Sequence, residues 1–382
     1  MTRRHFWELL RVAVLVAAFL ILTMLRHDAG PLRLTLQPVS FDQLQGWSDD
    51  RVAAAIPAFV KSCGRVAAHT DTTPLDTRFP TVTFGRVGDW RELCREAQAL
   101  PAGDDGAARQ FFEGGFVPVL AGDHDARDGP EHQGLFTGYF EIELRGSRRH
   151  HRAFQTPIYR KPPDPALAAR YSRAEIEAGA LAGQGLELLW VDDPVDAFLL
   201  QIQGSGRVRL EDGSAIRVGY DGQNGFPYVP VGRLLIERGA MLREQLTMAA
   251  IRAWMKTNPE AAAGLRGENP SFVYFREFRG DGPFGAEGVV LTPERSLAVD
   301  RALIPLGVPI WLEAEARFPQ SPSVHRLVIA QDVGGAIKGP VRGDLFWGTG
   351  PAAGALAGAM NARGRYYLML PRPVAARLAV LG

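Results

Sequence analysis

Alternating apolar and polar residues recur along the chain and predict short β-strands. The clearest stretch is 134–144. The segments 208–210 and 215–218 flank Asp212 and Gly213, a pair typical of a hairpin turn. The remaining predicted strands are 197–203, 272–275, 288–291, 308–312, 327–330 and 366–370.

Helical spacing is strongest in the first hundred residues. Asp49 and Asp50 are predicted to cap a helix that ends near Cys63, and a second helix is predicted to begin at Asp89. Further helices are predicted over 231–238 and 243–256, a loop over 101–106, and a capping box at Ser172 and Glu175. Because short strands broken by Gly and Pro do not alternate regularly with helices, the pattern favours a mainly β fold with helices, built from barrels, over a doubly wound sheet.

Composition narrows the function classes. A chain of 382 residues that is 46% hydrophobic and 22% charged is long enough for one large or two ordinary folded domains. Its formal charge is +1, or −2 without residues 1–27, which argues against nucleic acid as a partner because phosphate binding needs a clustered basic face. Two Cys and eight scattered His show no zinc-site spacing, so no metal or cofactor is expected.

The N-terminus has the features of a targeting segment. Arg3 and Arg4 precede an uncharged apolar run at 12–25, which is shorter than the roughly 20 residues of a comfortable membrane span. No clear cleavage site and no lipid-accepting Cys follow. We therefore predict that residues 1–27 are an uncleaved signal and inner-membrane anchor, with the rest of the chain in the periplasm. Signal cleavage, which would leave a secreted protein, is the alternative.

Carboxylates are the best candidates for chemistry, because the chain shows no nucleophile elbow and no phosphate-binding loop. Asp332 follows an apolar predicted strand and precedes glycines that allow a sharp turn. Asp344 is followed by Phe346 and Trp347, and apolar surroundings raise the pKa of a carboxyl group, as a general acid requires. A structural role in a turn is the alternative for each aspartate. The Asp332 motif also resembles half of an aspartic-protease site.

Several long motifs, in order, resemble those of the membrane-bound lytic murein transglycosylase A family. They are 134–140, 154–159, 201–206, 220–225, 269–275, 298–300, 332–339 and 343–348. The similarity covers roughly residues 134–370, whereas 28–130 match more loosely. The last three motifs contain Asp300, Asp332 and Asp344 and resemble the three-aspartate region that ends that family. The family's lipidated Cys after the signal is absent here.

The resemblance implies an architecture. A double-psi β-barrel catalytic domain would comprise residues 28–133 and 267–382. A smaller β domain, residues 134–266, would be inserted in it, with a sugar-binding groove between the two.

The resemblance also implies an activity, cleavage of the β-1,4 bond between N-acetylmuramic acid and N-acetylglucosamine in peptidoglycan, which leaves a 1,6-anhydro end. The family's single catalytic acid falls on Asp344, with Asp332 and Asp300 as supporting acidic residues. One acid suffices because the muramic 6-hydroxyl attacks within the same molecule, so that the acid first donates a proton and then accepts one. A water-using muramidase-type hydrolase and a non-catalytic peptidoglycan-binding protein are the alternatives.

Candidate substrate-binding residues offer neutral hydrogen-bonding groups or aromatic rings: Tyr139, Gln155, Gln203, Ser205, Asn224, Phe346 and Trp347. Arg145 and Arg207 are candidates for substrate carboxylates, with a solvated surface role as the alternative. The expected partners are peptidoglycan glycan strands and the membrane, with cell-wall synthesis or division complexes as further candidates.

The two cysteines are predicted to form a disulfide between the two N-terminal helices. The reason is that Cys63 and Cys94 are the only cysteines and the predicted compartment is oxidising. Two isolated buried thiols are the alternative.

Overall fold

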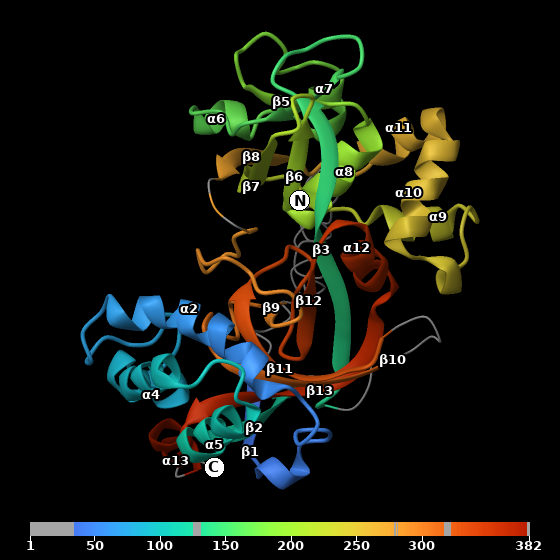
Figure 1. The fold of residues 1–382 in the computed structure, drawn as a ribbon. Helices are drawn as coiled ribbons and strands as arrows, with labels where there is room; N and C mark the ends of the chain where they lie inside the picture. Colours follow the sequence, from blue (N-terminus) through green and yellow to red (C-terminus); the bar gives the residue numbers. More distant parts are fainter. Residues whose placement is uncertain (1–33, 125–130, 279, 281, 317–321, 380–382) are drawn as a thin grey trace, which may run out of the picture.

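The computed structural model describes residues 34–124, 131–278, 280, 282–316 and 322–379 (Figure 1). The predicted anchor, residues 1–27, lies outside these ranges. Within them, no helix combines the length and the apolar character needed to cross a membrane.

Six strands pair in a closed ring. They are β3 (Gly134–Ser147), β9 (Ser296–Val299), β10 (Pro309–Ala316), β11 (Val324–Asp332), β12 (Arg342–Thr349) and β13 (Asn361–Pro371). Around the ring, β3 pairs with β12, β12 with β9, β9 with β11, β11 with β10, β10 with β13, and β13 with β3. The β3–β12 and β9–β11 pairs are parallel and the others are antiparallel. Two further strands, β1 (Leu34–Pro38) and β2 (Phe116–Asp123), extend the sheet from β13.

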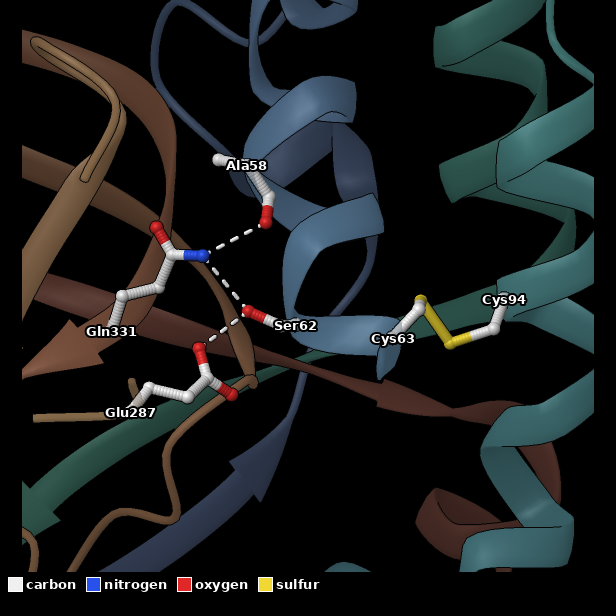
Figure 2. The surroundings of a disulfide bond; sticks show 6 residues. All are labelled: Ala58, Ser62, Cys63, Cys94, Glu287 and Gln331. Atoms are coloured by element: carbon white, nitrogen blue, oxygen red, sulfur yellow. Dashed lines mark hydrogen bonds between the residues drawn. A yellow bond between two sulfur atoms is a disulfide. The ribbon is translucent and has the colours of Figure 1, made fainter. Parts of the chain in front are cut away.

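Helices from the N-terminal part pack beside this ring (Figure 1). They are η1 (Phe41–Gln43), η2 (Val52–Ala55), α2 (Ile56–Ala67), α3 (Thr81–Phe84), α4 (Val87–Ala99) and α5 (Asp105–Gly115), joined by the C-terminal α13 (Arg372–Ala379). Their aromatic residues share one hydrophobic core with the strands, in which Trp47 contacts both Phe112 and Trp311 edge to face. Cys63 on α2 and Cys94 on α4 form a disulfide with a Cα–Cα distance of 5.6 Å, as the sequence predicts (Figure 2).

The strand β3 continues out of the ring into a second region with its own core (Figure 1). There it pairs with β6 (Ser205–Leu210), followed by β7 (Ala215–Gln223) and β8 (Val273–Phe278), and with β5 (Glu187–Val191), which pairs with β4 (Thr156–Tyr159). The surrounding helices are α6 (Pro165–Ala168), α7 (Arg173–Glu177), α8 (Pro194–Gln203), α9 (Val231–Glu237), η3 (Arg243–Gln245), α10 (Met248–Thr257) and α11 (Pro259–Gly267). The remaining helix, α12 (Gly350–Ala359), packs against β3 and β12.

The predicted mainly β fold with helices is confirmed, as are the β6–β7 hairpin and the capping box of Ser172 and Glu175. The predicted strand at 197–203 is wrong, because this segment belongs to helix α8. Asp193 accepts hydrogen bonds from the first backbone N–H groups of α8, Pro194 occupies its first turn, and Gly204 ends it in the left-handed conformation. These end signals outweigh the apolar run between them.

Two smaller expectations also differ from the structure. Residues 288–291 form no strand, and only one isolated bridge joins Phe284 to Val290. Asp50 does not cap a helix, because its carboxylate pairs with Arg295 at 2.7 Å and accepts the N–H of Leu327. The helix starts later, at Ile56, and continues past Cys63.

Candidate active site

Asp332 and Asp344 lie on opposite sides of the short strand β9. Each is the register partner of Ala298, Asp332 across the parallel β9–β11 pair and Asp344 across the antiparallel β9–β12 pair. Adjacent strands lie about 4.8 Å apart, so the two backbones are separated by roughly 10 Å. The ring therefore brings together two aspartates that the sequence separates by a glycine-rich turn.

The carboxyl group of Asp344 is partly buried and is held by one neighbouring strand. The Thr137 hydroxyl on β3 donates to Asp344 Oδ1 at 2.7 Å, and Arg342 Nη2 donates to the same hydroxyl oxygen at 2.8 Å. Burial raises the pKa of Asp344, while the positive charge of Arg342 and the Thr137 hydrogen bond lower it. The net effect favours the protonated acid, which is the form that a proton donor requires.

Asp332 ends β11 and is held by three donors. Tyr139 donates its hydroxyl to Oδ2 at 2.8 Å, and Oδ1 accepts the backbone N–H groups of Ala286 at 2.8 Å and Val333 at 2.9 Å. Burial raises the pKa of Asp332 to about 6, although all three hydrogen bonds lower it. Burial and the nearby Asp332 raise the pKa of Tyr139 well above its usual value, so that this hydroxyl remains a donor.

Asp300 holds the turn that joins the other two aspartates. Its Oδ2 accepts the N–H of Gly339 at 3.0 Å, and its Oδ1 accepts the N–H of Ala302 at 3.1 Å. Lys338 Nζ lies 3.7 Å from the same carboxylate. Gly339 lies between β11 and β12, so Asp300 acts on the segment that connects Asp332 to Asp344.

The candidate substrate-binding residues do not form one cluster in the structure. Tyr139 lies on Asp332, and the next residue, Phe140, donates its N–H to Gln203 Oε1 at 3.1 Å. Ser205 begins β6, beside the point where β3 enters the second region. Tyr139, Gln203 and Ser205 therefore lie along one path from the aspartates toward that region.

The other four candidates are either buried or remote from this path. Phe346 and Trp347 are only 1% and 8% exposed, and the Phe346 ring packs 5.3 Å from that of Tyr139, so neither ring presents an open face for sugar. Asn224 is buried and binds the backbone of Phe272. Gln155 is exposed and precedes β4, whose partner β5 pairs with the far end of β3.

The distance of Gln155 from the acid follows from the register of β3. Thr137 pairs with Asp344, whereas Gly146 pairs with Val191, which in turn pairs with Thr156. The strand between 137 and 146 is about 30 Å long at 3.3 Å per residue. Gln155 is therefore remote from Asp344.

Arg145 and Arg207 lie on the surface of the second region. Arg145 is mostly exposed and lies 3.6 Å from Asp192, and Arg207 lies 4.0 Å from Glu143. These ion pairs agree with the solvated role that the sequence left open. Among the described residues, no group of three or more His, Cys, Asp or Glu side chains could hold a metal ion.

Sequence reasoning missed Thr137, Arg342 and the N–H of Ala286. Alternation along β12 would have indicated Arg342, because residues two apart on a strand point to the same face. Thr137 lies 207 residues before Asp344, and only the register of β3 against β12 brings the two together.

With this geometry in view, two family models match the chain. One is described as the MltA specific insert domain and matches residues 135–276, and the other is the 3D domain and matches 295–370. The membrane-bound lytic murein transglycosylase A of Vibrio cholerae is 39% identical over 242 residues, which are 61% of this chain. The matched part spans 64% of that relative, just under two thirds of its length.

Two solved structures match over most of their length. The lytic transglycosylase LtgG of Burkholderia pseudomallei is 42% identical with a TM-score of 0.61, covering 90% of this chain and 98% of that one. Escherichia coli MltA with bound chitohexaose is 31% identical with a TM-score of 0.66, covering 90% and 95%. On the strength of these matches, the chain belongs to the MltA family.

Proposed function

We propose that this protein is a peptidoglycan lytic transglycosylase in which Asp344 is the single catalytic acid. The observation that carries the proposal is the partly buried Asp344 carboxyl group, with its raised pKa and its hydrogen bond to Thr137. Its fold is shared with proteins that are named lytic transglycosylases. The bond cleaved is the β-1,4 bond between N-acetylmuramic acid and N-acetylglucosamine.

The mechanism needs one proton donor that later accepts a proton. Asp344 gives its proton to the oxygen of the leaving sugar, and the muramic 6-hydroxyl attacks the anomeric carbon. The Asp344 carboxylate then takes the proton of that hydroxyl, so the glycosidic bond breaks, a 1,6-anhydro ring forms and no water is consumed. Tethering of the nucleophile replaces the second carboxylate that an ordinary glycosidase uses. Asp332 and Asp300 hold the surrounding backbone.

We further propose that glycan strands bind in a groove between a double-psi β-barrel and the inserted domain. The barrel would comprise residues 28–133 and 267–382, and the insert 134–266. The closed ring of six strands and the separate core of the second region support a barrel with an insert, although β3 belongs to both cores and β8 pairs within the second region. Chitohexaose bound to the E. coli relative supports a glycan as ligand. Gln203 and Ser205, both partly exposed, are the proposed groove residues, whereas Tyr139 is only 8% exposed and binds Asp332 through its hydroxyl.

The proposed location is the periplasmic face of the inner membrane, with residues 1–27 as anchor. The relatives that are named membrane-bound support an envelope location. Sequencing of the mature N-terminus tests the anchor. A start near Met1 is expected, and a start beyond Leu25 would leave a protein without it.

Two other functions fit the same fold. A water-using muramidase would place a second carboxylate opposite the acid. The carboxylate of Asp332, the candidate for this second role, instead accepts hydrogen bonds from Tyr139 and two backbone N–H groups. A non-catalytic glycan-binding protein would not need a buried acid, whose burial in the charged form is unfavourable. The geometry of both aspartates therefore favours the transglycosylase.

Substitution of the acid tests the proposal. Asp344→Asn keeps the size of the side chain but cannot transfer a proton, so release of soluble fragments from purified peptidoglycan should fall by at least about 10²-fold. Binding to peptidoglycan and the melting temperature should be retained. Asp192→Asn, which changes a partly exposed carboxylate beside Arg145, is the matched control and should keep full activity. Full activity in Asp344→Asn would move the catalytic role to another carboxylate.

A further inference from the structure

The segment 283–291 folds over the end of β11, next to Asp332. Glu287 donates its backbone N–H to the carbonyl oxygen of Gln331 at 3.1 Å, and Ala286 donates its N–H to Asp332 Oδ1. Gly285 allows this close approach, because a Cβ there would lie 2.3 Å from the Gln331 carbonyl oxygen. One donor to the Asp332 carboxylate therefore depends on how this segment is held.

A buried network of hydrogen-bonded polar side chains holds this segment against the rest of the protein (Figure 2). Glu287 Oε2 accepts the hydroxyl of Ser62 on α2 at 2.6 Å, and that hydroxyl oxygen accepts Gln331 Nε2 at 2.9 Å. Gln331 also donates to the carbonyl of Ala58 at 2.8 Å and accepts the hydroxyl of Ser296 at 2.6 Å. The side chains of Glu287 and Gln331 are both 0% exposed. Buried networks of this kind fix a single arrangement only when their members are paired.

Consecutive residues of α2 hold the segment and also fix the helix. Lys61 Nζ donates to the carbonyl of Val290 at 3.0 Å, Ser62 binds Glu287, and Cys63 forms the disulfide to α4 (Figure 2). The N-terminal helices, which match the family motifs only loosely, are thereby linked to the candidate active site.

We propose that Glu287 is a positioning residue for Asp332, holding the 283–291 segment so that the N–H of Ala286 stays on the Asp332 carboxylate. The inference rests on the proposed function only for its effect on activity. Loss of this N–H would remove a hydrogen bond that lowers the pKa of Asp332, so the pKa of Asp332 would rise. The contact between Ala286 and Asp332 can be measured without any enzymatic assay.

The surroundings of Glu287 make its hold on the 283–291 segment dependent on pH. Burial raises the pKa of Glu287 to about 7, and its Oε1 has no hydrogen-bond partner. Arg65 on α2, 3.7 Å away, partly offsets this. Asp332 lies on the adjoining strand, and the charged or titratable residues that line the neighbouring cavity of about 470 Å³ are His69, Asp76, Arg78 and Arg301. Above pH 7 the ionised carboxylate is a buried charge that Ser62 and Arg65 compensate only in part, so the segment should loosen.

Amide hydrogen exchange at Ala286 and the pH profile of fragment release test this proposal in the full chain. Glu287→Ala should speed exchange at Ala286 and lower kcat, each by about tenfold, with KM within twofold. Glu315→Ala removes an exposed carboxylate on β10 that pairs with His325 and is the matched control. It should change neither measurement.

Glu287→Gln keeps the acceptor for Ser62 but cannot ionise, and it remains informative where Glu287→Ala fails to fold. At pH 6 it should match the wild type in exchange at Ala286. At pH 8, after correction for intrinsic rates, the wild type should exchange faster than this variant. Exchange at Ala286 within twofold of the wild type in Glu287→Ala, or a ratio of wild type to Glu287→Gln that does not change with pH, would overturn the proposal. Absence of activity in the wild type would refute the proposed function but would leave the exchange result intact.

Discussion

Two side chains, Thr137 and Arg342, lower the pKa of Asp344, whereas burial raises it. Thr137 donates directly to the carboxyl group, and Arg342 binds the Thr137 hydroxyl while its charge acts on Asp344. Burial and these two neighbours oppose each other, so the pKa of Asp344 is adjustable by substitution at either position.

Substitution of Arg342 tests this balance. Arg342→Gln removes a positive charge that lowers the pKa of Asp344, so that pKa should rise. Asp344 then stays protonated to higher pH, and the alkaline limb of kcat/KM for fragment release should move to higher pH. Arg342→Lys keeps the charge and should leave the limb near its original position. An unmoved limb in Arg342→Gln would show that Arg342 does not act on the proton donor.

The sequence indicates the three aspartates better than the residues that surround them. Asp300, Asp332 and Asp344 are marked by their motifs, and the apolar residues after Asp344 agree with the desolvation that raises its pKa. Phe346 and Trp347 are predicted to bind substrate, yet both are almost fully buried, because an aromatic ring beside an acid can face either the substrate or the core. Strand register and packing against α12 decide which way each ring faces, and neither can be predicted from the local sequence.

At the level of elements, helix-end signals carry more information than apolar runs. The segment 197–203 consists mostly of apolar residues and suits a buried strand or a buried helix equally well. Asp193, Pro194 and Gly204, which flank it, decide for the helix. The hairpin at Asp212-Gly213 was predictable because its turn requires a positive φ, and Gly213 has a φ of 83°.

The packing of β3 against α12 and Trp347 requires a residue without a side chain at position 138. A Cβ on Gly138 would lie 2.6 Å from Trp347 Nε1 and 2.8 Å from the Cα of Ala357. Gly138→Ala should therefore lower the free energy of unfolding by about 1–3 kcal/mol, measured in urea. Gly114→Ala, on α5 with no atom within 4 Å of the added Cβ, is the control and should not destabilise the protein. Equal stabilities of the two variants would contradict the packing described.

The disulfide between α2 and α4 closes a loop with a sequence separation of 31 residues. In the chain-entropy account, its removal costs about 3.7 kcal/mol of unfolding free energy. The double variant Cys63→Ala, Cys94→Ala should show this loss in urea unfolding relative to the oxidised wild type. Thiol labelling of the denatured, unreduced wild type should find no free thiol, whereas two labelled cysteines would refute the bond.

For the whole molecule, one strand and one buried ion pair join the two regions near the proposed groove. The strand β3 belongs to both cores, and Glu141 on it, 1% exposed, binds Arg217 at 3.2 Å and the Thr349 hydroxyl at 2.8 Å. Arg217 lies on β7 in the second region, and Thr349 ends the strand that carries Asp344. The relative position of the acid and the second region is thus fixed by polar contacts as well as by the shared strand.

The sequence motifs anticipated the family and the mixed sheet, but not the role of the N-terminal helices. Those helices match the family motifs loosely, yet α2 supplies Ser62 and Lys61 to the 283–291 segment over Asp332. These contacts join residues more than 220 positions apart. They have no local sequence signature.

Mass analysis of the fragments that the full-length protein releases from purified peptidoglycan distinguishes transglycosylation from hydrolysis. If Asp344 protonates the leaving oxygen while the muramic 6-hydroxyl closes on the anomeric carbon, each fragment is lighter by one water than the corresponding muramidase product and has no reducing muramic end. Asp344→Asn should release none of these fragments above background. Hydrated fragments with reducing muramic ends would contradict the account and identify the protein as a hydrolase.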